Sequence, residues 1–396
     1  MKIRIRFWWW VIIGTLLFSL LGVKAQPPSR VHADVMTLVG LGPRVAGTPT
    51  IQKARDYLLA EYRESGYVTE VGTFTYPKFL DNGSNLLVNN AQLDGRALAG
   101  SRAGKLQAPL IGVPGVGKPD EFAAVNVKNA IAIVRRGEIR FLDKARNAQN
   151  AGAVGLVIVN TSSGELAGTL GGEVNIPVFS LSGERGEPLL KKALASRLEA
   201  TLNVNTQGGN VTGYNAIAHK PGVKSPRILI GGHYDSVLGS PGANDNASGT
   251  AVVLELARRL ANTPLANQIW FVAFDGEEDG LHGSKAFVNS ASPEFLKGLQ
   301  AMLNFDMVGV NEKLLVGGTS ELTALATKAD PKISTFRDTG SSDHQSFTSA
   351  GVPAIFFYRG QDPNYHSPND TQVDPKLLEA TVEAANRIIQ ERLAQN

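Results

Sequence analysis

Four apolar segments in the second half of the chain each lead to a histidine or a carboxylate. The segments are RILIGG, NQIWFVAF, AMLNF and VPAIFFYR, and the residues that follow them include His233, Asp275, Asp306 and, after a loop, His366. Short apolar runs bounded by turn signals are typical of strands that are buried on both faces. We therefore expect four strands, each with a polar residue beyond its end.

Helical patterns separate these strands. Ser248–Ala261 has apolar residues at helical spacing, and the helical segments Ser29–Leu41 and Ile51–Ser65 precede a strand predicted at Tyr67–Tyr76. Strands that alternate with helices imply a largely parallel sheet with both faces covered. The expected fold class is therefore α/β, with a mostly parallel mixed sheet flanked by helices. In such sheets functional groups gather at the carboxyl ends of the strands.

Each polar residue has an ordinary explanation when it is considered alone. Asp245 stands in GANDNASG just before a helix, where an aspartate is most often an N-cap or turn residue. A lone histidine after a strand is more often hydrogen-bonded than a ligand. Asp306 lies in an apolar segment, where a carboxylate needs a partner. Two histidines and three carboxylates at strand ends are nevertheless hard to explain as coincidence.

The chain contains no cysteine. This excludes a disulfide framework, a thiolate metal site and a cysteine nucleophile. Any bound metal must therefore sit on His, Asp and Glu. Two histidines and three carboxylates suit a pair of divalent ions, and imidazole with carboxylate favours zinc, with cobalt or manganese possible.

The first 25 residues differ from the rest of the chain. Lys2, Arg4 and Arg6 form a basic start, the 17 residues Phe7–Val23 are almost all apolar, and Val23-Lys24-Ala25 offers small residues for cleavage. The pattern predicts a signal peptide at residues 1–25 and a secreted or periplasmic protein. An uncleaved membrane anchor is the alternative, because the apolar run is at the short edge of what spans a bilayer.

The net charge of +3 originates in this segment. The chain has 39 Lys and Arg and 36 Asp and Glu, and four basic residues lie in the first 25, which leaves 35 basic residues against 36 acidic ones. A mature chain with a net charge of −1 lacks the basic surplus that favours nucleic acid binding. We expect no nucleic acid partner and, after signal cleavage, no stable membrane association.

The region from about Leu86 to Asn205 is rich in valine and glycine and has several short strand candidates around a helix at Leu142–Ala151. It has no constellation of His, Asp and Glu. The run IAIVRRGEIRFLDKARNAQNAGAVGLVIVN, followed by IPVF, resembles the protease-associated (PA) domain found inserted in several peptidase families. The resemblance implies an inserted small β-rich domain at residues 86–205.

Five motifs resemble those of the M28 family of co-catalytic zinc peptidases. They are HYDS, GANDNASG, FDGEEDGLHGS, NFDMVG and YHSPND, in family order and at family-like separations. The resemblance covers roughly Ser29–Tyr76 and Gly209–Asn396. It implies two Zn²⁺ per chain and a discontinuous peptidase domain at residues 26–85 and 206–396, interrupted by the PA domain.

The resemblance also implies the metal ligands. His233 and Asp306 would hold one zinc, Glu278 and His366 would hold the other, and Asp245 would bridge both.

Three further residues would support the reaction. Glu277 would be the general base. It would take a proton from a water molecule that bridges the two zinc ions and would pass it to the leaving amine. Asp235 is placed to orient the imidazole of His233. Tyr365 would donate to the oxyanion, as in members that use a tyrosine there, and its alternative is aromatic packing under the loop.

The implied activity is that of a secreted metallo-exopeptidase, most directly an aminopeptidase that acts on peptides or proteins. A carboxypeptidase of the same family, a glutaminyl cyclase with one zinc and a non-catalytic, receptor-like relative are the alternatives. The complete set of five ligands and a base favours an enzyme over the receptor. The preferred terminal residue and the oligomeric state do not follow from the sequence.

Overall fold

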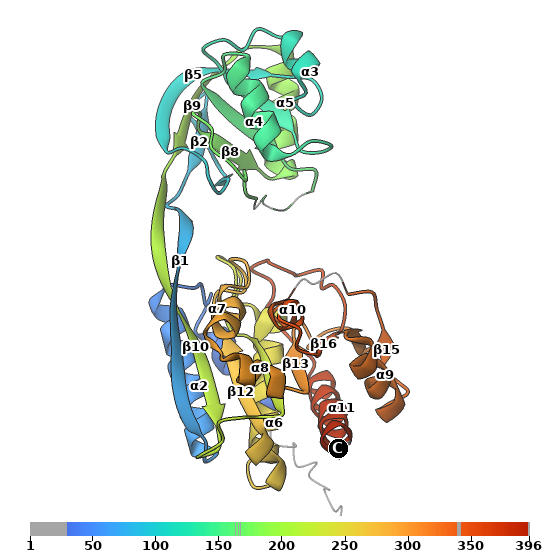
Figure 1. The fold of residues 1–396 in the computed structure, drawn as a ribbon. Helices are drawn as coiled ribbons and strands as arrows, with labels where there is room; N and C mark the ends of the chain where they lie inside the picture. Colours follow the sequence, from blue (N-terminus) through green and yellow to red (C-terminus); the bar gives the residue numbers. More distant parts are fainter. Residues whose placement is uncertain (1–29, 163, 165, 167, 339–341, 395–396) are drawn as a thin grey trace, which may run out of the picture.

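The structure, a computed structural model, describes residues 30–162, 164, 166, 168–338 and 342–394. The predicted signal peptide at residues 1–25 lies outside these ranges and stays a prediction. None of the described helices is long and apolar enough to cross a membrane. The described residues form two units, each built on one eight-stranded sheet, and a two-stranded ribbon joins them (Figure 1).

The first unit, below in Figure 1, has a sheet with the strand order β1-β10-β12-β11-β13-β16-β14-β15. Four neighbouring strands at its centre are parallel, and antiparallel strands flank them. The structure confirms the mostly parallel mixed sheet. The central strands are β11 (Ile228–His233), β12 (Ile269–Phe274), β13 (Ala301–Phe305) and β16 (Ala354–Tyr358); the others are β1 (Val68–Asp81), β10 (Thr206–His219), β14 (Leu315–Gly318) and β15 (Ser334–Thr335).

Helices cover both faces of this sheet. Adjacent residues of one strand enter opposite cores, as Phe271 and Val272 of β12 do. This two-sided burial explains why the central strands are apolar at consecutive positions. One face packs against α1 (Arg30–Gly40), α2 (Pro49–Glu64), α6 (Gly249–Leu260), α9 (Ser320–Ala329) and α11 (Pro375–Ala394), and the other against α7 (His282–Ser290), α8 (Pro293–Gly298) and α10 (His344–Ser349).

The second unit spans residues 85–204 and has a sheet in the order β3-β2-β9-β5-β6-β7-β8-β4. Strands β5 to β8 are parallel to one another. Helix α5 packs on one face, and α3 and α4 pack on the other. The elements are β2 (Asn85–Val88), β3 (Ala91–Asp94), β4 (Arg96–Ala97), β5 (Gly104–Gly112), α3 (Pro119–Ala123), β6 (Ile131–Arg135), α4 (Phe141–Asn150), β7 (Gly155–Val159), β8 (Val178–Leu181), α5 (Gly183–Ala195) and β9 (Leu198–Val204).

The ribbon that joins the units consists of β1 and β10. The two strands pair along their whole lengths, but only Ala216–His219 of β10 also pair with β12. Because β12 is antiparallel to β10 and ends at Phe274, the remaining part of the ribbon extends beyond the carboxyl ends of the central strands. The ribbon therefore leaves the first sheet at the edge where its parallel strands end (Figure 1).

The element ends differ from the prediction at two instructive places. The strand predicted at Tyr67–Tyr76 is confirmed but continues to Asp81. The helix predicted from Ser248 begins at Gly249, and the Ser248 hydroxyl donates to the carbonyl of Asn244 instead of capping the helix.

Candidate metal centre

The parallel strands bring the predicted residues to one edge of the first sheet. His233 is the last residue of β11, and Asp306 directly follows β13. The loop after β12 contains Glu277 and Glu278, and the loop after β16 contains His366. Because the carboxyl ends of parallel strands meet at the same edge, residues far apart in the sequence become neighbours there.

Asp245 lies in the turn Ala243–Ser248, which precedes α6 and is buried throughout. Its position depends on Asp370, whose carboxylate accepts hydrogen bonds from the amides of Asn244 at 2.8 Å and Asp245 at 3.0 Å. No side chain caps α6, so the ordinary explanation of Asp245 as an N-cap is wrong. The surrounding hydrogen bonds leave its carboxylate directed at the site.

Two groups of side-chain atoms that could bind a metal ion meet at this edge, and Asp245 belongs to both. We call them the donor groups. In each group the donor atoms all lie within 4.8 Å of one another. Oδ1 of Asp245 is 3.3 Å from Nε2 of His233, and Oδ2 is 3.1 Å from Nε2 of His366. The groups are His233, Asp245 and Asp306, and Asp245, Glu278 and His366.

The donor atoms have the spacing of metal ligands. Nε2 of His233 is 3.4 Å from Oδ1 of Asp306, and Nε2 of His366 is 3.0 Å from Oε2 of Glu278. Tetrahedral bonds of about 2.0–2.1 Å place neighbouring ligand atoms roughly 3.3–3.4 Å apart. Oε1 of Glu278 and Oδ1 of Asp306 are also buried without a hydrogen-bond partner. Each group therefore has donor chemistry and spacing that suit a divalent cation such as zinc.

The electrostatics of the site point the same way. Burial, and to a smaller extent the negative charge of Asp245, raises the pKa of Glu278 to about 7. Burial acts in the opposite direction on His366, but its hydrogen bonds to Asp245 and Glu278 outweigh it and raise the pKa of His366 to about 10. The carboxylate and the imidazole thus both attract protons, and a divalent cation would satisfy the same demand for positive charge.

Asp235 connects the two sides of the site. Its Oδ1 is 3.4 Å from Nδ1 of His233, which supports the predicted role in orienting that imidazole. Its carboxylate also accepts hydrogen bonds from the backbone amides of Glu277 and Glu278, each at 3.2 Å. This second contact was not predicted from the sequence, and it fixes the backbone of both glutamates.

Glu277 and Glu278 occupy different positions despite being adjacent. Glu278 belongs to one donor group, whereas Glu277 belongs to neither. The side chain of Glu277 is 11% exposed, and its Oε2 is 3.9 Å from Nε2 of His233. A carboxylate beside the donor groups but outside them is free to exchange a proton, as the general-base prediction requires.

Tyr365 stacks on His366, with ring centroids 3.7 Å apart, and 40% of its surface is exposed. Burial, and to a smaller extent the negative charge of Asp245, raises the pKa of its hydroxyl above the usual range, so the hydroxyl keeps its proton. The stacking matches the packing alternative, and the retained proton is what a hydrogen-bond donor needs. The ring therefore packs, and the hydroxyl stays a candidate donor.

Sequence reasoning missed Arg44, a fully buried residue of the turn-rich segment GPRVAGTPT. Its guanidinium donates to the carbonyls of Tyr234, Pro241 and Gly242 at 2.7, 2.5 and 2.9 Å. These carbonyls lie between His233 and Asp245, the first two predicted metal ligands in the sequence, so Arg44 holds that stretch of backbone in place. A single arginine in a turn gives no sequence signal of burial, because arginine is seldom buried.

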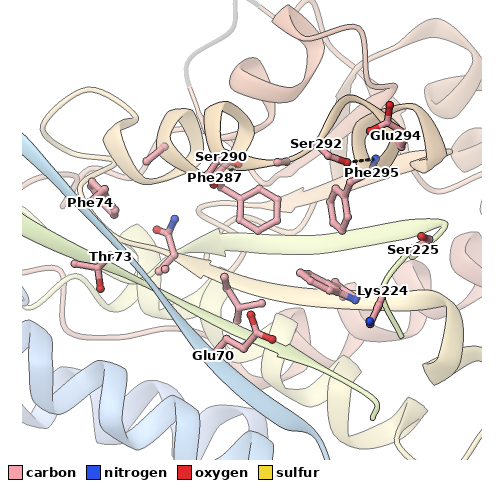
Figure 2. A pocket seen from close by; sticks show the side chains of 16 residues that line it. Glu70, Thr73, Phe74, Lys224, Ser225, Phe287, Ser290, Ser292, Glu294 and Phe295 are labelled. Carbon is pink, nitrogen blue, oxygen red and sulfur yellow. Dashed lines mark hydrogen bonds between the residues drawn. The ribbon is translucent and has the colours of Figure 1, made fainter. Parts of the chain in front are cut away.

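A separate cavity of about 500 Å³ is lined by residues of β1, β10, α7 and α8 (Figure 2). Its lining includes Trp270 of β12, Phe287 of α7, Phe295 of α8 and Glu70 of β1. None of the predicted ligands, the base or Tyr365 lines it. The cavity is therefore distinct from the donor groups.

Comparisons with known proteins give a family match in each of the two units. Residues 215–389 match the model of Peptidase family M28, and residues 99–189 match that of the PA domain. The chain is 34% identical over 360 residues to Aminopeptidase YwaD of Bacillus subtilis, covering 84% of this chain and 76% of that protein.

Two solved structures are also similar. An aminopeptidase from Aneurinibacillus sp. strain AM-1 has 30% identity and a TM-score of 0.74, with 92% of this chain and 93% of that chain covered. BSAP, a zinc aminopeptidase from Bacillus subtilis, has 30% identity and a TM-score of 0.79, with 93% and 96% covered.

Proposed function

The chain belongs to peptidase family M28, and from this premise we propose that it is a zinc-dependent aminopeptidase that removes N-terminal residues from peptides. The observation that carries the proposal is the carboxylate of Asp245, which presents one oxygen to each of two donor groups at 3.3 and 3.1 Å. Glu277 stands beside both groups without belonging to either. The similarity to aminopeptidases, one of them a zinc enzyme, supports the same activity.

One zinc ion is assigned to each donor group. His233 and Asp306 would hold the first, Glu278 and His366 the second, and Asp245 would be shared. When bound, two such ions would supply the acidity that activates a water molecule and the positive charge that polarises the carbonyl of the scissile bond. A glutaminyl cyclase with a single zinc would leave one of the two donor groups without a role.

Glu277 would carry out the proton transfer. From its position 3.9 Å from His233 it would accept the proton of the attacking water and deliver it to the leaving amine. The hydrogen bond from its amide to Asp235 fixes the backbone from which the side chain extends. The hydroxyl of Tyr365 would donate to the carbonyl oxygen as negative charge develops on it.

The proposed site suits a substrate with a free amine. Catalytic zinc sites keep an open ligand position, which the nitrogen of an unprotonated α-amine could fill, whereas the bound ions would already balance the charge of the donor carboxylates. A carboxypeptidase would instead need a basic side chain facing the substrate's terminal carboxylate. Two buried arginines near this edge of the sheet, Arg44 and Arg359, each already donate to three backbone carbonyls and do not offer that group.

The export of the protein and its domain boundaries are part of the proposal. Residues 1–25 would be removed as a signal peptide, which places the enzyme outside the cytoplasm. The peptidase domain would comprise residues 26–85 and 206–396, and the PA domain residues 86–205. The separate sheet formed by residues 85–204 and the PA match within it support this division.

A substrate scan tests the proposed activity. Aminoacyl-p-nitroanilides and dipeptides blocked at either end would be incubated with the purified chain, before and after chelation. We expect cleavage of the carboxyl-blocked dipeptide but not of the amine-blocked one, loss of turnover on chelation and recovery with zinc. The opposite blocking pattern would indicate a carboxypeptidase. Turnover that survives chelation in protein free of transition metal would overturn the proposal.

A further inference from the structure

Asp279 directly follows the two glutamates, and two side chains of β1 hold it. The Tyr76 hydroxyl donates to Oδ2 of Asp279 at 2.5 Å, and Nζ of Lys78 lies 2.7 Å from the same oxygen. The side chains of Lys78 and Asp279 are only 11% and 24% exposed, so salt screens this ion pair less than a surface pair. None of the roles assigned above uses these three residues.

Further contacts fix the two β1 side chains. The ring of Tyr76 stacks on Phe74 and on His282, with centroids 5.9 and 4.0 Å away. Nζ of Lys78 also donates to the carbonyl of Ala46 at 3.2 Å. Because His282 begins α7, the ribbon contacts both the start of that helix and the loop before it. We call that loop, residues 275–281, the acidic loop.

The acidic loop is therefore held from two sides. On one side, Asp235 accepts hydrogen bonds from the amides of both glutamates at 3.2 Å. On the other side, β1 holds Asp279. Just before these points Gly276 has a φ of +71°, and a Cβ there would lie 3.2 Å from the Tyr76 hydroxyl. Tyr76 thus packs against the backbone of the loop as well as bonding to its aspartate.

The strand that holds Asp279 also leads to the second unit. The part of β1 that lies opposite the β12-paired residues of β10 is Val68–Val71. Tyr76 and Lys78 lie beyond it, where the ribbon has left the sheet and runs toward residues 85–204 (Figure 1). The contact with Asp279 therefore ties the acidic loop to the connection between the two units.

We propose that Asp279 is a positioning residue that, with Tyr76 and Lys78, fixes the acidic loop against the ribbon and so sets where Glu277 and Glu278 stand. The inference rests on the proposed zinc peptidase function, in which one glutamate transfers protons and the other holds an ion. A misplacement of about 1 Å at a catalytic group can cost about 10²-fold in rate. The ribbon thereby acts on catalysis without supplying a catalytic residue.

Three variants of the full chain test this role. Asp279→Ala removes the held carboxylate, whereas Tyr76→Phe removes one donor and keeps the stacked ring. Glu70→Gln is the matched control, because Glu70 lies on the same strand and contacts His219 at 3.1 Å at the opposite end of the ribbon. The readouts are kcat, KM and zinc affinity by competition with a chelator.

We expect Asp279→Ala to lower kcat and to weaken zinc binding by about 10- to 100-fold each, as loss of an outer support does at other metal sites, with little change in KM. Tyr76→Phe should show a smaller loss of the same kind, and Glu70→Gln should match the wild type. Wild-type kcat and zinc affinity in Asp279→Ala would overturn the proposal, even if its thermal stability fell.

Amide hydrogen exchange in the metal-free chain separates this inference from the proposed function. The backbone amides of residues 276–282 should exchange faster in Asp279→Ala than in the wild type and in Glu70→Gln, because exchange reports local opening. Unchanged exchange would overturn the inference whatever the activity of the protein. A wild-type chain without zinc-dependent turnover would overturn the proposed function instead, and the exchange result would still decide the role of Asp279.

Discussion

The two sheets of this molecule share an arrangement of strands and differ in the chemistry at the strand ends. Each sheet has four neighbouring parallel strands and a buried cation close to their carboxyl ends. In the second unit Lys144 of α4 donates to the carbonyls of Val116, Arg135 and Gly137. In the first unit Arg44, in the loop between α1 and α2, also donates to three carbonyls. Both cations hold the loops that follow the strands.

The difference lies in which polar groups are satisfied. In the second unit, Asn160 accepts from Arg136 at 3.0 Å, and Ser182 accepts from the amide of Arg185 at 3.3 Å. In the first unit one buried oxygen of Glu278, Oε1, and one of Asp306, Oδ1, have no hydrogen-bond partner. Within the described ranges, both potential metal-binding groups belong to the first unit. The carboxyl ends of parallel strands thus offer a position for a site in both units. Buried oxygens without a hydrogen-bond partner indicate which of the two units has a candidate site.

The largest expected effect is on Glu277. Glu277→Gln should lower kcat by about 10²–10⁴-fold, because the amide keeps the shape of the side chain and cannot accept the proton. The metal content should stay near the wild-type value, since Glu277 belongs to neither donor group. Turnover of a p-nitroanilide and elemental analysis measure the two quantities. Near-normal turnover would show that Glu277 is not the base.

The hydroxyl of Tyr365 comes next. Tyr365→Phe keeps the ring that stacks on His366 and removes only the candidate donor. If the hydroxyl stabilises the oxyanion, kcat should fall by about 10²-fold, with the metal content unchanged. The same turnover assay decides the matter. An unaltered kcat would leave Tyr365 with its packing role alone.

The two buried cations allow a direct test of the comparison between the sheets. Arg44→Met and Lys144→Met should each lower the free energy of unfolding by at least about 2 kcal/mol, because buried carbonyls lose their partners. Only Arg44→Met should also weaken zinc binding, since only its carbonyls lie next to donor residues. Urea unfolding and chelator competition measure these changes. Equal zinc affinity in both variants would contradict the claim that Arg44, and not Lys144, supports the metal ligands.

The smallest effect is expected at the surface of the second sheet. Arg135 and Glu187 form an ion pair of 2.7 Å, with side chains 44% and 40% exposed. Arg135→Met should cost less than about 1 kcal/mol, because solvent screens such pairs, and it should leave kcat unchanged. Urea unfolding beside Lys144→Met provides the check. A loss as large as that of Lys144→Met would mean that exposure does not set the stability contribution here.

Each donor residue could be predicted from the sequence because it lies in a short motif, which follows an apolar strand for four of them and precedes a helix for Asp245. His233 and Asp306 are within one residue of their strand ends, so local patterning suffices to place them. Arg44 and Asp279 could not be found in this way. Their partners are about 190 and 200 residues away in the chain, and no local pattern records such contacts.

The limits of the fold prediction have similar physical causes. Pro77 lies within β1, and proline argues against a strand except at the edge of a sheet, which is where β1 stands. The strand predicted from its alternating pattern ends at Tyr76, so the length of the ribbon was missed. Helix α5 went unpredicted, and Pro188 lies inside it, where proline usually signals a break.

The most direct test of the central claim is the metal content of the wild type and of Glu278→Ala, purified with equal care and analysed for zinc per chain. If Asp245 is shared by two groups, the wild type should contain about two zinc ions and the variant about one, because only the group with His366 loses a ligand. A wild type without transition metal, or a variant that keeps both ions, would contradict the account.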